Sequence, residues 1–407
     1  MHILFLTQIL PYPPSSGPKV KTWHVLRYLS QNGHKITLGS FVRPEEIEYI
    51  QAVKTVCSRV HTVPIKRSRI SDIGYMLRSQ ITGRPFLVER DDIAEMRSAV
   101  QQIVENEAVD VIHADQLTMT QFALPYANRP NGKPVLIFDA HNAVWTITER
   151  MQETLPFYLQ LPLMLETKRI KQYEGMIIRD FDATFAVTEL DRQALKAAVP
   201  ANGVAKSESI TVVPIAVDTD QIRPVARQAD SLNLLTMGTL YYPPNADGIR
   251  WFVREVFPLI RSKVPGVKLT IIGKNPPADF LKLAEDASNR IQVTGFVPEL
   301  DPYFAESALA VIPVRAGGGM RVRILEAFAR AMPVVTTTVG LEGIEAVPGQ
   351  DVLVADTPDD FANAVCRILG DPALQAQLST NGRQLAESKY DWQAALRAVD
   401  NVYRQFG

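Results

Sequence analysis

The fold of this chain is decided by residues 308–340, which read ALAVIPVRAGGGMRVRILEAFARAMPVVTTTVG. The run from Ala308 to Val314 is apolar and has the length of a buried strand. Three glycines, Gly317 to Gly319, lead into an amphipathic segment typical of a helix, and PVVTT follows as a second apolar run. A strand, a glycine loop, a helix and a strand in this order indicate two parallel strands joined by a helix.

The same alternation of short apolar runs and amphipathic segments extends over the whole chain and predicts a doubly wound α/β fold. The first half opens with a strand at His2–Thr7, a Pro/Ser/Gly loop and a helix over residues 20–31. The pattern restarts after Asp218, where NLLTMGTL is expected to be a new first strand. The other expected strands are KITLGSF, VDVIHAD, PVLIFDAHN, ATFAVT and ITVVPIAV before the restart, and KLTIIG, IQVTGFV, ALAVIPV and PVVTT after it.

This restart predicts two Rossmann-like domains that face each other across a cleft. A chain of 407 residues is long enough for two domains of ordinary size. We expect the N-terminal domain to span residues 1–218 and the C-terminal domain to span residues 219–388. A last helix, within residues 389–407, lies beyond the second expected sheet, and we expect it to pack back on the N-terminal domain.

Composition excludes several classes of protein. Apolar residues make up 46% and charged residues 21% of the chain, as in an ordinary globular protein. Because Lys and Arg number 43 and Asp and Glu number 44, no broad basic field exists for nucleic acid, and we expect no nucleic-acid partner. The two cysteines, Cys57 and Cys366, are too few for a disulfide framework or a zinc site. The N-terminus has no secretory signal and no run is long enough to span a membrane, so a cytoplasmic location is expected.

The glycine loop of residues 317–319 is a candidate anion site. Gly317, Gly318 and Gly319 allow backbone to approach a ligand closely, and the N-terminus of the following helix offers free N–H groups. Arg321 and Arg323 fall in its first turn, where the helix dipole disfavours cations, so their placement favours a bound phosphate or diphosphate. The alternative is a solvated turn in which the arginines pair with Glu326 or another surface acid.

A nicotinamide dinucleotide is not the expected ligand. The first strand is followed by QILPYPPSSGPK and the restart strand by GTLYYPPN, and neither contains the GxGxxG pattern that such a cofactor requires. The second strand ends in SFVR and lacks an acidic residue for a ribose.

Six segments together resemble retaining nucleotide-sugar glycosyltransferases of the GT-B fold, family 4. They are YPPSSGPKVKTWHVLRYLSQNGHKITL, FDAHN, AVTELD, MGTLYYPPNADGIRWFVREVFPLI, TGFVPELDPYFAES and GGGMRVRILEAFARAMPVVTTTVGLEGI, and they are distributed over nearly the whole chain. The PPN and GGG–x–Arg–x–Arg features are most similar to bacterial exopolysaccharide sugar transferases, including those associated with PEP-CTERM export. The resemblance implies that residues 1–218 bind an acceptor and residues 219–388 bind the nucleotide sugar.

For the donor, the resemblance implies roles for residues of the C-terminal half. Glu326 matches the second glutamate of the family motif and would hydrogen-bond the nucleotide ribose, whereas the first glutamate is replaced by Gly318. Arg321, beside Arg323, is our choice for the diphosphate, because the family's usual Arg/Lys pair is missing from GTLYYPPN. Val297 matches the position that recognises the base. The complete expected donor set is Gly238, Thr239, Asn245, Gly273, Val297, Gly317, Gly318, Gly319, Met320, Arg321, Arg323, Leu325 and Glu326.

For the N-terminal half, the resemblance implies a loop that approaches the reacting phosphate and a histidine beside the transferred sugar. Gly17 matches that loop, and His141 in FDAHN matches the histidine. The expected acceptor and diphosphate residues are Ser16, Gly17, Lys21, His113 and Asn142. The expected catalytic residues are His141, Arg321 and Glu326.

The resemblance also implies a mechanism. The acceptor attacks the front face of the sugar while the departing diphosphate takes its proton, so no carboxylate nucleophile is required. We expect that the reaction requires no cofactor and no metal. The expected co-substrate is a nucleotide-diphosphate sugar, and a UDP-sugar is favoured. Two alternatives remain open: a GT-B nucleotide-sugar epimerase, and a catalytically inactive nucleotide- or glycan-binding protein on the same scaffold.

The acceptor is expected to be a glycan or a lipid-linked glycan. Residues 54–90 hold eight basic and two acidic side chains with apolar residues interleaved, which is typical of a helix that contacts an anionic membrane surface. The alternative is an ordinary solvated helix. We predict that replacing Lys66, Arg67 and Arg69 with glutamate weakens binding of the protein to liposomes. The expected location is cytoplasmic, with peripheral contact at the inner face of the membrane.

Overall fold

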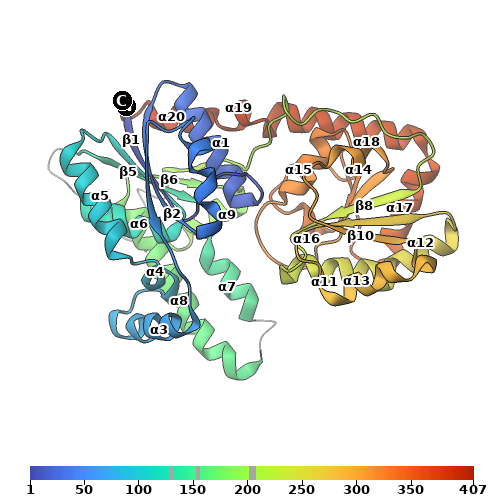
Figure 1. The fold of residues 1–407 in the computed structure, drawn as a ribbon, viewed down its shortest axis with the longest axis horizontal. Coiled ribbons are helices and arrows are strands. Elements are labelled where there is room, and N and C mark those ends of the chain that lie inside the picture. The colour runs from blue at the N-terminus through green and yellow to red at the C-terminus, as the bar shows by residue number, and fades with distance from the viewer. Residues whose placement is uncertain (128–131, 153–155, 201–207) are drawn as a thin grey trace. The chain divides into compact units, whose positions relative to one another are not determined.

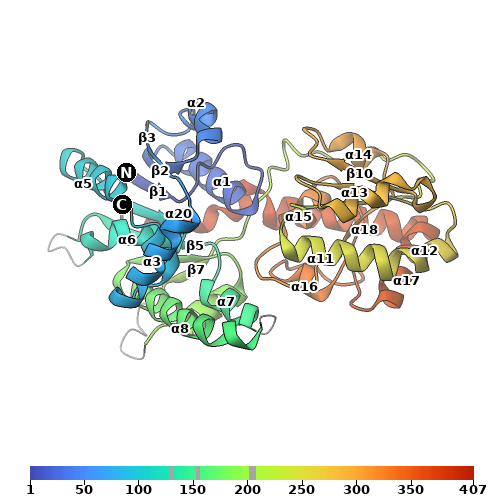
Figure 2. The same ribbon diagram turned by 60° about the horizontal axis from the view of Figure 1, so that its bottom comes forward.

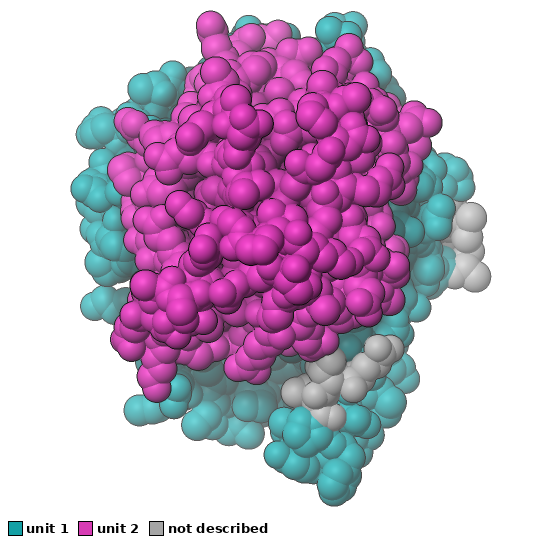
Figure 3. Space-filling model, turned by 90° about the vertical axis from the view of Figure 1, so that its right-hand side faces the viewer, with its two compact units in different colours: residues 1–215, 395–407 teal, residues 216–394 magenta. Residues whose placement is uncertain are grey.

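A computed structural model describes residues 1–127, 132–152, 156–200 and 208–407. These residues form two compact units, coloured separately in Figure 3. Unit 1 comprises Met1–Ile215 with Ala395–Gly407, and unit 2 comprises Ala216–Ala394. The division thus lies at Ile215 where the sequence predicts Asp218, and the C-terminal return begins at Ala395 where it predicts residue 389.

Unit 1 is built on a seven-stranded parallel sheet with the order β3-β2-β1-β4-β5-β6-β7 (Figure 1). Every residue of β1 is buried, as expected for a strand covered on both faces by helices. The strands are β1 (His2–Thr7), β2 (Lys35–Val42), β3 (Arg59–Pro64), β4 (Val111–Asp115), β5 (Val135–Ala140), β6 (Ala183–Ala186) and β7 (Ile210–Val212). The last strand is shorter than the expected ITVVPIAV.

The helices of unit 1 include its C-terminal return. They are α1 (Gly17–Gln31), α2 (Ile50–Val53), α3 (Arg69–Thr82), α4 (Phe86–Arg90), α5 (Ala94–Asn106), α6 (Thr120–Ala123), α7 (Val144–Gln152), α8 (Phe157–Asp180), α9 (Glu189–Lys196) and α20 (Arg397–Tyr403), with short 3-10 turns at Pro44–Tyr49, Leu117–Met119 and Leu124–Tyr126. Helix α1 begins at Gly17, three residues before the expected start, with a proline in its first turn.

Unit 2 repeats the architecture with a six-stranded parallel sheet of order β10-β9-β8-β11-β12-β13. The strands are β8 (Asn233–Met237), β9 (Lys268–Ile272), β10 (Ile291–Gly295), β11 (Leu309–Ile312), β12 (Val334–Thr336) and β13 (Leu353–Val354). The helices are α11 (Pro243–Trp251), α12 (Phe257–Lys263), α13 (Ala278–Glu285), α14 (Asp301–Ala305), α15 (Val322–Ala329), α16 (Thr338–Leu341), α17 (Pro358–Gly370), α18 (Pro372–Leu385) and α19 (Trp392–Ala395), with a 3-10 turn at Ala287–Asn289 and π-helical turns at Phe252–Val256 and Ala386–Tyr390.

The two sheets reverse strand order at equivalent places. In unit 1 the switch lies between β1 and β4, and in unit 2 between β8 and β11. Open parallel sheets bind ligands beyond the carboxyl ends of the strands at such a switch. The fold therefore places one candidate site in each unit, after β1, β4 and β5 in unit 1 and after β8 and β11 in unit 2. Among the helices of the described residues, none combines the length and the apolar character needed to cross a membrane.

Candidate active site

The carboxyl ends of the first strands of unit 2 are tied together by two glycines. The Gly238 N–H donates to the carbonyl of Ile272 over 2.8 Å, and the Gly273 N–H donates to that of Gly295 over 2.9 Å. A Cβ added to Gly273 would lie 1.8 Å from the Gly238 carbonyl oxygen, so only glycine fits there. Val297, the residue expected at the base, follows the third of these strand ends and is half-buried.

The start of α11 and the glycine loop adjoin this edge. The side chain of Asn245 donates from Nδ2 to the carbonyl of Thr239 over 3.2 Å, and it lies against Gly238. Gly317 has a φ of 99°, in the left-handed region that favours glycine. A Cβ at this position would contact Pro244 at 3.6 Å. The structure thus brings the expected residues of the restart strand and of the glycine loop to one place.

Arg321 lies on the glycine loop itself. Its Nη2 donates to the carbonyl of Gly317 over 2.9 Å and its Nη1 donates to that of Gly318 over 2.7 Å, with a further bond to Gly319. The guanidinium that we expected to grip a diphosphate therefore holds the loop carbonyls in this conformation. Arg321 is also the N-cap position of α15 rather than a residue of its first turn.

Arg323 and Glu326 present ionisable groups near the start of α15. Both are half-buried, and among the described residues neither side chain has a hydrogen-bond or ion-pair partner. Burial lowers the pKa of Arg323, and the nearby Glu326 carboxylate opposes this shift. In contrast, the side chains of Leu325 and Met320 are buried, at 0% and 7% exposure, so either could contact a donor mainly through its backbone.

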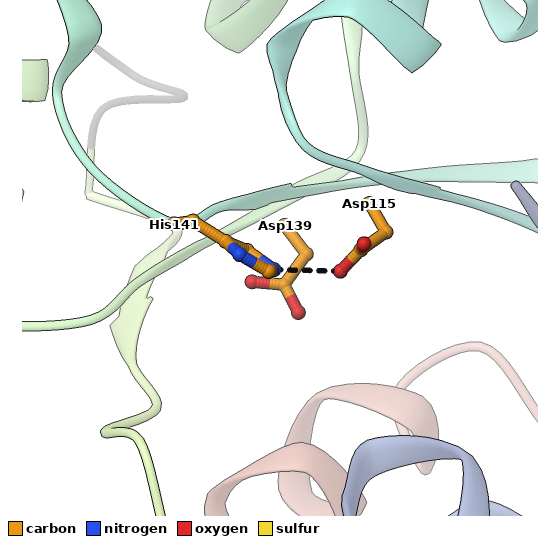
Figure 4. Close-up of side chains that lie close together, drawn as sticks. All are labelled: Asp115, Asp139 and His141. Atoms are coloured by element: carbon orange, nitrogen blue, oxygen red, sulfur yellow. Dashed lines mark hydrogen bonds and ion pairs between the residues drawn. The ribbon is translucent and has the colours of Figure 1, made fainter. Parts of the chain in front are cut away.

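In unit 1 the corresponding edge holds two aspartates and a histidine, shown in Figure 4. Asp115 ends β4, Asp139 lies near the end of β5, and His141 follows one residue after that strand. The Nε2 of His141 lies 2.7 Å from Oδ1 of Asp115. The other oxygen of Asp115 accepts hydrogen bonds from Thr7 at 2.9 Å and Thr22 at 3.0 Å. His141 is 8% exposed as a whole residue, and its Nδ1 has no partner among the described residues.

The negative charge of the Asp139 carboxylate is balanced by the ammonium group of Lys21, in α1. Their side chains, 0% and 1% exposed, form an ion pair. Burial alone would raise the pKa of Asp139, but the Lys21 ammonium and the hydrogen bond from His113 outweigh it and hold that pKa well below its usual range. Lys21 was expected to contact the acceptor or the diphosphate, but its ammonium in α1 is buried and paired with Asp139 in this conformation.

His113 is a core residue. It has no exposed surface, stacks on Phe5 with ring centroids 4.3 Å apart, and lies 2.7 Å from the hydroxyl of Tyr403 and 3.4 Å from Asp139. The expectation that His113 contacts a substrate is therefore not supported, because its position on β4 points it between the sheet and α20. It supports Asp139 instead.

The other expected residues of unit 1 lie at the surface of the same edge. Ser16 is the N-cap of α1 and makes no side-chain capping bond, so the N–H groups of the first turn beginning at Gly17 are not capped by it. Asn142 is half-buried beside His141. These three residues remain candidates for contact with a ligand.

A buried carboxylate fixes the segment that carries His141. Glu174 of α8 has no exposed surface and accepts the backbone N–H groups of Val144 over 2.8 Å and Trp145 over 3.2 Å, at the start of α7. Asp191 accepts the N–H of Ala143 over 3.0 Å. Burial raises the pKa of Glu174 to about 8, against the effect of the two N–H donors.

Asp115, Asp139 and His141 also have the geometry of a possible metal site. Their ligand atoms all lie within 4.8 Å of one another. Two carboxylates and an imidazole are suitable ligands for several divalent ions. In this conformation, however, Asp139 forms an ion pair with Lys21, and Asp115 accepts a hydrogen bond from Nε2 of His141, so these ligand groups already have partners within the chain.

Sequence reasoning identified His141 and missed Asp115, Asp139 and Glu174. The two aspartates had a usable signal, because each closes an apolar run, in VIHAD and FDA, and the carboxyl ends of adjacent parallel strands meet. Glu174 had none, because it lies 33 residues after His141 in a helix whose other buried residues are mostly apolar.

The chain matches two protein-family models. The model described as Glycosyltransferase Family 4 matches residues 16–221, and the model described as Glycosyl transferases group 1 matches residues 231–371. An uncharacterized 44.6 kDa protein in the cps region of Klebsiella pneumoniae is 22% identical, and the alignment covers 96% of each chain.

Solved structures show the same fold. Sucrose-phosphate synthase from Thermosynechococcus elongatus has a TM-score of 0.72 and 17% identity, and the match covers 100% of this chain and 98% of that one. Anabaena HepE, solved in complex with UDP and glucose, has a TM-score of 0.68 and 13% identity, with 100% of both chains covered. The two parallel-sheet units therefore constitute a GT-B glycosyltransferase fold, as the sequence predicted.

Proposed function

Because the chain belongs to glycosyltransferase family 4, we propose that it transfers a sugar from a nucleotide-diphosphate sugar to a glycan or lipid-linked glycan in bacterial polysaccharide biosynthesis. A UDP-sugar is the favoured donor. Support for the donor comes from the complex of HepE with UDP and glucose. Support for the pathway comes from the Klebsiella pneumoniae relative, which is described as a protein of the cps region.

The observation that carries this proposal is the arrangement at the start of α15. A loop of three glycines leads into the N-terminus of a helix, and the side chains of Arg323 and Glu326 follow without a hydrogen bond or an ion pair among the described residues. The helix N-terminus and a guanidinium both favour an anion, and a carboxylate can accept hydrogen bonds from a ribose. We assign the diphosphate to Arg323 and the backbone of residues 318–320, and the ribose to Glu326, with Arg321 as the brace of the loop.

The proposed reaction retains the configuration of the sugar. The bond between the anomeric carbon and the diphosphate oxygen breaks, the acceptor oxygen bonds to the same face of that carbon, and the acceptor proton passes to the departing diphosphate. Arg323 and the N–H groups of α15 would stabilise the negative charge that develops on the leaving group. His141, held by Asp115, would orient the sugar through its free Nδ1. With Arg323 and the helix N-terminus at the leaving group, we propose that transfer is independent of metal.

The test is a panel of UDP-, GDP- and ADP-sugars. The wild-type protein should show a thermal shift with one nucleotide class and release that nucleotide in the presence of acceptor. The Arg323→Ala variant should bind the nucleotide about tenfold or more weakly, since a charge-assisted hydrogen bond contributes about 1.5–3 kcal/mol.

The matched control is Arg367→Ala, which removes an exposed arginine from α17 of the same unit and should leave affinity unchanged. Equal affinity in wild type and Arg323→Ala would contradict the assignment of the diphosphate. Loss of activity with a chelator and its return with manganese would contradict the metal-independent step.

A further inference from the structure

Helix α3 is folded with its apolar face toward solvent. Its only buried residue in the described structure is Ser79, whose hydroxyl donates to the carbonyl of Arg84 over 2.6 Å. The outward face carries Ile70 and Ile81, which are 84% and 87% exposed. The exposed large apolar side chains of the helix are Ile70, Ile73, Met76, Leu77 and Ile81. An amphipathic helix that covers a core has the opposite orientation.

The first half of α8 is also exposed and apolar. Residues 157–165 read FYLQLPLML and contain no charged side chain. Helix α8 enters the core only from Thr167 onward, and Phe157 is 84% exposed. The exposed large apolar side chains here are Phe157, Tyr158, Leu159, Leu161, Met164 and Leu165. Composition alone does not distinguish this segment from a buried helix, because apolar side chains of this kind are equally typical of a helix in the core.

The two helices lie at the same end of unit 1. The guanidinium of Arg169, in α8, donates to Gln80 of α3 over 2.7 Å. Glu166, also in α8, accepts the N–H of Phe86 at the start of α4 over 2.6 Å. Figures 1 and 2 both show α3 beside α8. We call the eleven exposed side chains of α3 and α8 together the two-helix face.

The charges around this face are uneven. Arg67, Arg78 and Arg84, part of the basic stretch that the sequence singled out, are paired with acidic residues of the segment 89–92. By contrast, Lys66 before α3, Arg69 at its first position and Lys168 after the apolar part of α8 are exposed and have no ion-pair partner among the described residues. Asp72 in the first turn of α3 also has no ion-pair partner among the described residues, so the unpaired charge beside the apolar side chains is net positive.

We propose that the two-helix face docks on a bilayer that contains anionic phospholipid. Large apolar side chains that are exposed together on two neighbouring helices mark an interaction site. Large apolar side chains would enter the boundary between headgroups and acyl chains, and Lys66, Arg69 and Lys168 would contact the phosphates. The proposal goes beyond sugar transfer and does not depend on it, although it would hold the enzyme where a lipid-linked acceptor lies.

The test is co-sedimentation with vesicles of phosphatidylcholine alone or mixed with phosphatidylglycerol. Wild type should bind the mixed vesicles, and Phe157→Ser/Leu161→Ser should reduce the partition coefficient at least about tenfold, since each exposed side chain buries several methylene equivalents. Lys66→Glu/Arg69→Glu/Lys168→Glu should reduce binding to the mixed vesicles. This variant should then bind the mixed vesicles no more tightly than vesicles of phosphatidylcholine alone.

The matched control is Leu190→Ser/Leu281→Ser, which removes two exposed leucines outside the face and should bind as wild type does. All the variants should keep the wild-type melting temperature, because the substituted side chains are exposed. Failure of wild type to bind either vesicle would overturn the proposal. So would a wild-type dimer in light scattering that Phe157→Ser/Leu161→Ser converts to monomer, because the occupant would then be a second copy of the chain. Nucleotide release with a water-soluble acceptor reports on transfer separately.

Discussion

At the scale of single residues, the ion pair of Lys21 and Asp139 stabilises the charged form of a buried carboxylate in the unit 1 site. Both side chains are buried. Lys21→Met would leave a buried carboxylate without its cation, so we predict a loss of about 3–5 kcal/mol in the free energy of unfolding, measured by urea denaturation. Lys133→Met, which breaks the exposed pair with Asp110, should cost less than about 1 kcal/mol. Similar small losses in both variants would contradict the role given to Lys21.

Glu174 gives a prediction about pH. Its pKa is raised to about 8 by burial, so the folded chain binds the proton more tightly than the unfolded chain does. The contribution of Glu174 to the free energy of unfolding should therefore be complete below the ordinary glutamate pKa of about 4.3. This contribution should decrease as the pH rises toward 8.

We expect Glu174→Gln to flatten the dependence of the unfolding free energy on pH in this window. Glu149→Gln, at an exposed position of α7, should keep the wild-type slope. A Glu174→Gln variant whose slope matches that of wild type would show that Glu174 titrates normally in the folded protein.

The residues of the site were predictable to different degrees. His141 could be found from the sequence because it follows a strand and matches a family pattern. The orientation of Arg321 could not, because hydrogen bonds to the Gly317 and Gly318 carbonyls depend on the loop conformation. The burial of His113 depends on Tyr403, which comes from the far end of the chain.

At the scale of elements, the close approach of β8 and β9 leads to a comparison of two glycines. A Cβ at Gly273 would lie 1.8 Å from the Gly238 carbonyl oxygen, whereas one at Gly74, in α3, would meet nothing within 4 Å. We predict that Gly273→Ala destabilises unit 2 by more than about 2 kcal/mol and weakens nucleotide binding. Gly74→Ala should be neutral or stabilise by up to about 1 kcal/mol. Thermal denaturation without and with nucleotide measures the stability of each variant and its nucleotide binding. A Gly273→Ala variant with the stability and the nucleotide binding of wild type would contradict the packing described.

Periodicity predicted the elements well where they bury one face. The strand–loop–helix–strand of residues 308–340 is present as β11, the glycine loop, α15 and β12. The helical segment after β8 is irregular for a local reason, since the π-helical turn Phe252–Val256 separates α11 from α12 before Pro258. Helix α3 lies within the basic stretch 54–90 and exposes its apolar side chains.

At the scale of the whole molecule, the C-terminal return makes unit 1 depend on the last residues of the chain. Tyr403 is 2% exposed and its hydroxyl lies 2.7 Å from Nδ1 of His113. We predict that Tyr403→Ala lowers the melting temperature of unit 1 and leaves that of unit 2 unchanged, because the cavity it creates costs about 3–5 kcal/mol.

Tyr390→Ala is the reciprocal variant. Tyr390 is 3% exposed, and its hydroxyl accepts the N–H of Glu345 within unit 2. Loss of this side chain should therefore lower the melting temperature of unit 2. Differential scanning calorimetry with and without UDP assigns the transitions, since a ligand stabilises the unit that binds it. If Tyr403→Ala lowered only the UDP-sensitive transition, the assignment of the return to unit 1 would be wrong.

The central claim is that this member of glycosyltransferase family 4 moves a sugar to an acceptor, and mass spectrometry of the acceptor tests it most directly. After incubation with the nucleotide sugar selected by the panel and with lipid-linked or free glycan acceptors, wild type should add one sugar residue per nucleotide released. His141→Ala should bind the nucleotide as wild type does and lose most of this mass gain. Nucleotide binding by wild type with no gain in acceptor mass, or conversion of the donor sugar to its epimer, would contradict the account.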